Sequence, residues 1–162
     1  AVNPNDWRSH NNIGLIYVRK GKSKEAYRHF SEVLRIKFDH QEAHISLGTI
    51  LKSYGRIEEA KKHFLTVLEI NPNHSTAHNN LGLILVEKGD LKSGKEHYLK
   101  AIQTDPEYAV AFNNLAIAFI NDGNVSEAIS HFSSALRINP DFHQAKLNIE
   151  MARKLLEEKD DK

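Results

Sequence analysis

The sequence contains no cysteine among its 162 residues, and only one methionine, one tryptophan and four prolines. The lack of cysteine excludes disulfides and thiol chemistry and is compatible with any cellular compartment. An excess of one charge is also missing, because 22 Lys and Arg residues oppose 21 Asp and Glu residues. No basic field therefore indicates a nucleic-acid partner. No apolar run approaches the roughly 20 residues that cross a bilayer, so we expect no direct membrane insertion of this chain.

What the sequence does contain is an unbroken period of 34 residues. Glycines recur at this interval, and an aromatic residue follows nine positions after each of them. The glycines are Gly21, Gly55, Gly89 and Gly123, and the aromatic residues are Phe30, Phe64, Tyr98 and Phe132. Such a period predicts stacked supersecondary units, each of which buries its apolar faces against its neighbours.

One unit, residues 41–74, shows the local structure that the period predicts. Apolar residues recur at helical spacing up to Gly55, which can close a helix in the left-handed conformation. A second periodic stretch follows and ends at Pro72, which cannot continue the hydrogen-bond ladder. The unit is therefore predicted to be two antiparallel helices of about 13 residues, each about 20 Å long.

Small residues recur where these two helices must cross closely. They are Gly14, Gly48, Gly82 and Ala116 in the first helices, and Ala26, Ala60, Gly94 and Ala128 in the second helices. With the glycine, the aromatic residue and a late proline, this pattern resembles the tetratricopeptide repeat (TPR). The repeats are 7–40, 41–74, 75–108 and 109–142, with 143–158 as a capping helix, 1–6 as the tail of a preceding unit and 159–162 as a frayed charged tail. The resemblance implies an all-α fold, a right-handed α-solenoid of antiparallel helix pairs.

The resemblance also implies a superhelix in which the first helices line a concave groove. Two kinds of residue fall at the groove positions: a column of asparagines, whose amides complement a peptide backbone, and a stripe of apolar residues that a solvated helix face normally lacks. These candidate partner-binding residues are Asn12, Leu15, Val18, Ile45, Asn79, Asn80, Leu83, Val86, Val110, Asn113, Asn114, Ile117, Ile120 and Asn148. Two alternatives stay open: the asparagines bond within the array, or another copy of the chain or a terminal helix covers the stripe.

Chemical motifs are not found. The sequence holds no Walker loop, GxSxG elbow or HExxH pair. Nine of its ten histidines recur one full repeat apart, and none of the ten lies three or four residues from another within a predicted helix, as ligands that share a face would. We therefore expect no catalytic residue, no metal site and no cofactor, and no enzyme activity in this chain.

The preferred hypothesis is a protein-interaction module that binds a peptide or an amphipathic helix in its groove. As an alternative, the opening residues, Val2 to Asn12, resemble the start of TPR tails that follow the membrane domain of bacterial glycosyltransferase-like proteins. In that case the chain would present a substrate to, or assemble, a larger enzyme whose catalytic domain lies outside it. Self-association through the repeat ends is a third hypothesis. The sequence leaves the localisation unassigned.

Overall fold

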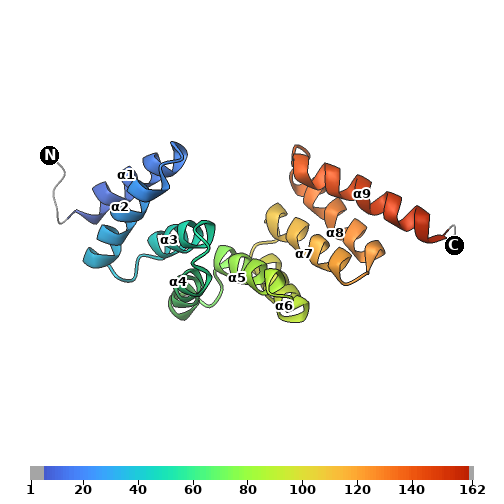
Figure 1. Ribbon diagram of the computed structural model, residues 1–162, viewed down its shortest axis with the longest axis horizontal. Coiled ribbons are helices and arrows are strands. Elements are labelled where there is room, and N and C mark those ends of the chain that lie inside the picture. The colour runs from blue at the N-terminus through green and yellow to red at the C-terminus, as the bar shows by residue number, and fades with distance from the viewer. Residues whose placement is uncertain (1–5, 161–162) are drawn as a thin grey trace. The chain divides into compact units, whose positions relative to one another are not determined.

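The computed structural model describes residues 6–160, which form nine α-helices and no strand (Figure 1). The helices are α1 (Trp7–Arg19), α2 (Ser23–Ile36), α3 (Gln41–Ser53), α4 (Ile57–Ile70), α5 (Ser75–Glu87), α6 (Leu91–Thr104), α7 (Ala109–Asn121), α8 (Val125–Ile138) and α9 (His143–Asp160). They belong to two compact units, one that ends at Pro72 and one that begins at Asn73. The all-α class that the sequence predicts is confirmed, and each predicted repeat holds one pair of helices.

The turns between paired helices follow from one glycine each. These glycines have φ angles between 67° and 86°, in the left-handed region that disfavours a side chain. At Gly55, for example, the amide donates to the carbonyl of Lys52, and the next amide, of Arg56, donates to the carbonyl of Leu51. Together with the amide of Tyr54, these bonds satisfy carbonyls in the last turn of α3, and the chain can turn directly into α4.

Each helix pair closes around one aromatic side chain from its second helix. Phe30, Phe64, Tyr98 and Phe132 are all at most 1% exposed. In three repeats the ring lies against a glycine of the first helix, so close that an added Cβ at Gly48 would stand 2.6 Å from Phe64. The glycine column is therefore explained by close packing, which offsets the cost of about 1 kcal/mol that glycine brings to a helix interior.

Side chains cap the starts of α1, α3, α5 and α6. Asp6, His40 and His74 each accept a hydrogen bond from a backbone amide in the first turn of α1, α3 and α5 respectively. The histidines at the ends of repeats 1 and 2 thus act as N-caps, through Nδ1.

The predicted boundaries at the two ends of the chain differ in part from the extent of the helices. Helix α9 continues to Asp160, two residues past the predicted end of the capping helix. The predicted tail at 1–6 lies outside the described residues except for Asp6, and the predicted frayed tail extends beyond them at 161–162.

Candidate functional site

The candidate site lies on the C-terminal unit, where the first helices of successive repeats are neighbours. Helix α5 contacts α7, and α7 contacts α9. Their sequences place the predicted binding residues on one face, which we call the first-helix face. It comprises Asn79, Asn80, Leu83 and Val86 of α5, Val110, Asn113, Asn114, Ile117 and Ile120 of α7, and Asn148, Met151 and Leu155 of α9.

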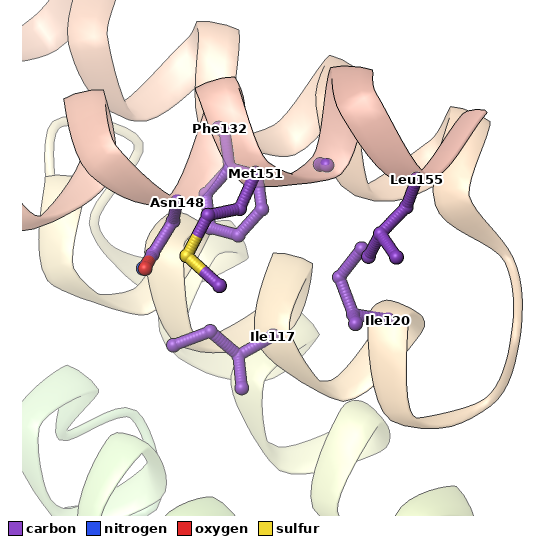
Figure 2. A pocket seen from close by; sticks show the side chains of 7 residues that line it. Ile117, Ile120, Phe132, Asn148, Met151 and Leu155 are labelled. Atoms are coloured by element: carbon purple, nitrogen blue, oxygen red, sulfur yellow. The ribbon is translucent and has the colours of Figure 1, made fainter. Parts of the chain in front are cut away.

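An apolar cavity of about 220 Å³ opens on this face between α7 and α9. It is lined by Ile117, Ile120, Phe132, Asn148, Met151, Ala152 and Leu155. In Figure 2 the side chain of Met151 extends from α9 between Asn148 and Ile117, while Leu155 lies opposite Ile120. Phe132 of α8, which is 1% exposed, closes the cavity toward the core.

Three of the apolar side chains at the cavity are exposed to solvent. Met151 is 64% exposed, Leu155 42% and Ile117 36%. Nearby on the same face, Val110 is 40% exposed. Helix α7 is also free of ionisable side chains along its whole length, from Ala109 to Asn121. The face therefore offers apolar and neutral polar contacts, and α7 offers no charge to pair with a charged ligand.

Asparagines of the first-helix face form hydrogen bonds between repeats. Asn114 Nδ2 donates to Asn79 Oδ1 at 3.0 Å, and Asn148 Nδ2 donates to Asn113 Oδ1 at 3.0 Å. The two acceptors are buried, with Asn79 5% and Asn113 4% exposed. Asn80 differs, because its Nδ2 donates to the carbonyl of Thr76 in its own helix. The asparagine column thus joins adjacent repeats of this unit.

The predicted residues of the N-terminal unit lie on α1 and α3. Asn12, Leu15 and Val18 are exposed on α1, and Ile45 is half-buried on α3. Their neighbour Asn11 is 9% exposed, and its Oδ1 has no hydrogen-bond partner within the described part of the chain. None of the described cavities is lined by the predicted residues of this unit.

Of the predicted residues, the structure brings Ile117, Ile120 and Asn148 together in the cavity. The predicted binding residues did not include Leu155, Phe132 or Ala152, and Met151 was expected only as a continuation of the apolar stripe beyond repeat 4. The signal for Met151 and Leu155 was present, because they continue the groove positions of the repeats into the capping helix. Phe132 and Ala152 carried no such signal, since both belong to columns that the repeat uses for packing.

Neither a cluster of metal ligands nor a helical membrane span is found among the described residues. Among residues 6–160, no three His, Cys, Asp or Glu side chains are grouped so that they could hold a metal ion. In the same part of the chain, no helix combines the length and the hydropathy that a membrane span requires.

Comparisons with known proteins agree with this architecture. A solved structure of Pseudomonas aeruginosa PilF is 21% identical, with a TM-score of 0.84 over 94% of this chain and 69% of that one. MamA from Desulfovibrio magneticus RS-1 is 22% identical, with a TM-score of 0.75 over 93% of this chain and 85% of that one. YrrB, described as a TPR protein with an unusual peptide-binding site, is 25% identical, with a TM-score of 0.70 over 90% and 75% of the two chains.

Sequence comparison identifies the family directly. No curated protein matches the chain. Two family models of the tetratricopeptide repeat do match, one at residues 8–40 and 41–74 and the other at 63–96 and 97–130. These matches span well over half of the sequence, and the chain belongs to the tetratricopeptide repeat family.

Proposed function

We propose that the chain binds a peptide or an amphipathic helix on the first-helix face and anchors it by an apolar side chain in the cavity between α7 and α9. Tetratricopeptide-repeat proteins are generally non-catalytic scaffolds for protein–protein interaction. The proposal that a ligand is anchored there rests on the open cavity, with exposed Ile117, Met151 and Leu155 at its mouth. Such a patch on a protein surface typically marks a partner.

The size and polarity of the cavity favour one class of ligand. A cavity of about 220 Å³ has room for one large apolar side chain and is smaller than the roughly 300–1,000 Å³ of small-molecule pockets. Because none of the residues that line the cavity is charged, a charged anchor would lose its hydration without gaining an ion pair from the lining. Leucine, isoleucine, methionine or phenylalanine is the expected anchor.

The asparagines make a secondary contribution in this proposal. Asn114 and Asn148 each use one amide hydrogen for the bond to the preceding repeat. A side-chain amide carries two hydrogens, so each keeps one donor that can reach the backbone of a bound chain. The description of YrrB as a TPR protein with a peptide-binding site supports peptide binding on the same fold.

The test uses the full chain and a displayed library of short random peptides as the probe. We expect selection on the wild-type protein to enrich peptides that share one large apolar residue. Ile117→Glu together with Met151→Glu should weaken their binding by about tenfold or more, because a carboxylate in this cavity costs over 1.4 kcal/mol. Leu83→Glu together with Ile117→Glu should act in the same direction.

The matched control is Leu99→Glu. Leu99 is 49% exposed but lies on α6, a second helix, so this variant adds one glutamate away from the first-helix face, where the cavity variant adds two on it. Circular dichroism checks that every variant keeps its helical content. Peptides without a shared apolar residue, or equal binding losses in the cavity variant and the control, would contradict the proposal.

A further inference from the structure

Three of the four repeats contain a pair of histidines that touch across the helix pair. In each, the histidine at the fourth residue of the first helix faces the one 19 positions later on the second helix. The ring centroids lie 5.1–5.2 Å apart. The Nδ1–Nδ1 distances are 3.0 Å for His10–His29, 2.8 Å for His44–His63 and 2.9 Å for His78–His97. The repetition of one contact in one register indicates a feature built into the repeat.

A hydrogen bond between two Nδ1 atoms holds one hydrogen, so one ring must donate and the other must accept. In the second pair, His44 and His63, the donor and the acceptor can be assigned. His44 Nε2 lies 2.8 Å from the carbonyl oxygen of Phe38, which can only accept, so Nε2 carries a hydrogen. In neutral His44, Nδ1 is then the acceptor, and His63 Nδ1 donates to it.

This arrangement limits how many protons a folded pair can hold. One extra proton can bind to Nε2 of the donor ring, and the hydrogen bond between the two rings is kept. A second proton would put two N–H groups against each other at about 3 Å, where no acceptor remains. An unfolded chain has no such limit, so in acid it binds two protons per pair while the folded repeat binds at most one.

The surroundings of the pairs also disfavour charge. Burial lowers the pKa of His29, His44, His63 and His97, and for His29, His63 and His97 the partner ring lowers it further. Among the other groups that act on these rings are Glu32 near His29, Tyr17 stacked on His29, His40 and the Phe38 carbonyl near His44, Glu59 near His63, and Glu96 and Lys100 near His97. The three glutamates favour the charged rings, but for each histidine burial is the larger effect.

We propose that the three histidine pairs form a pH-sensitive lock, which joins the two helices of repeats 1, 2 and 3 at neutral pH and opens on acidification. Because the unfolded chain binds more protons than the folded one, the stability of the fold increases with pH. The loss of stability begins as the pH falls through 6.5, the ordinary pKa of an unfolded histidine, and continues below it. The fourth repeat lacks the lock.

That fourth repeat supplies the control variant. Phe112 occupies the position of the first histidine there, and its ring centroid lies 6.2 Å from that of His131. His131 also stacks on Phe119, as His29 stacks on Tyr17. The chain itself therefore shows that phenylalanine fits opposite the remaining histidine. The variant to make is His10→Phe with His44→Phe and His78→Phe, which leaves the N-caps His40 and His74 in place.

The experiment compares unfolding of the full wild-type chain and the triple variant by urea over a series of pH values from about 7.5 to 5. Each pair removed should reduce the number of protons taken up on unfolding by about one. As the pH falls by one unit, the unfolding equilibrium constant of the variant should therefore rise about tenfold less per removed pair than that of the wild-type chain. Three pairs together predict a difference that approaches a thousandfold per pH unit in acid. The same pH dependence in both proteins would overturn the proposal.

A second measurement needs no substitution. In the wild-type chain with labelled histidine nitrogens, NMR should detect a coupling across each Nδ1–Nδ1 hydrogen bond at neutral pH, and in acid these couplings should vanish only as the helix pairs unfold. Couplings that are missing at neutral pH, or that are lost in acid while the repeats stay folded, would overturn the lock. If the triple variant fails to fold, the single variant His44→Phe should still lower the proton uptake by about one.

Discussion

The side-chain oxygen of Asn11 has no hydrogen-bond partner among the described residues, and its equivalents in repeats 3 and 4 indicate how one could be supplied. In the C-terminal unit, Asn79 and Asn113 each accept a hydrogen bond from an asparagine 35 residues later. Asn11 is the equivalent residue of repeat 1, but the residue 35 positions later is Ser46, and Asn11 Oδ1 has no partner among the described residues. The serine side chain is too short to replace the asparagine amide. Ser46→Asn should therefore restore the missing bond.

The magnitude follows from the burial of this oxygen. A buried acceptor without a partner costs about 1–3 kcal/mol, which the new bond would recover. Ordering the longer asparagine side chain costs about 0.5–1 kcal/mol, and the two residues have similar helix propensities. The net expectation is a gain of about 1 kcal/mol in the free energy of unfolding, or about 2–4 °C in melting temperature for a chain of this length.

The assay is thermal and urea unfolding followed by far-ultraviolet circular dichroism. Two matched variants complete it. Asn114→Ser should remove the equivalent bond to Asn79 and destabilise the protein by about 1–3 kcal/mol. In an Asn11→Ala background, Ser46→Asn should give no gain. An unchanged stability for Ser46→Asn, or the same gain without Asn11, would refute the reasoning.

Three further predictions concern the packing and the ends of the helices. Gly48→Ala should destabilise the fold by about 1–3 kcal/mol in urea unfolding, because the added Cβ would stand 2.6 Å from the ring of Phe64. Gly55→Ala should cost about 1–2 kcal/mol in the same assay, because Gly55 has a φ of 74° with open space around it, so the penalty is one of backbone conformation alone. Asp90→Ala should lower the free energy of unfolding by about 1 kcal/mol, because Asp90 Oδ1 accepts a hydrogen bond from the amide of Ser93 at the start of α6. For each of the three variants, a free energy of unfolding that is unchanged within about 0.3 kcal/mol would argue against the role given to that residue.

The 34-residue period predicted the fold because each of its markers acts locally. A glycine with a positive φ ends a helix whatever surrounds it, and Gly21 and Gly123 do so in the first and last repeats alike. The aromatic column was also predictable, since a large apolar side chain in every unit needs a buried place, and Phe30 and Phe64 are 0% exposed.

Contacts between helices were harder to predict. Sequence spacing shows which side chains share a helix face, but contacts between helices depend on crossing angles and side-chain rotamers. The pairing of His10 with His29 was missed for this reason, although both columns were visible in the sequence. The bond from Asn148 to Asn113 was foreseen only as an open alternative to ligand binding.

Part of the candidate site was missed because the period fades at the C-terminus. Met151 and Leu155 follow the spacing of the groove positions, but α9 lacks the glycine and the aromatic residue that define a repeat. The cavity they form with Ile117 needs α9 to pack beside α7, which only the structure shows.

The most direct test of peptide binding on the first-helix face uses Met151, the single methionine of the sequence. A chain labelled at the methionine methyl gives one NMR resonance, and its side chain lies at the mouth of the cavity. Titration with a peptide selected from the random library should shift this resonance, with half of the full shift reached at a free peptide concentration equal to the dissociation constant measured by fluorescence polarisation. A peptide that binds by polarisation but leaves the Met151 resonance unmoved would contradict the account.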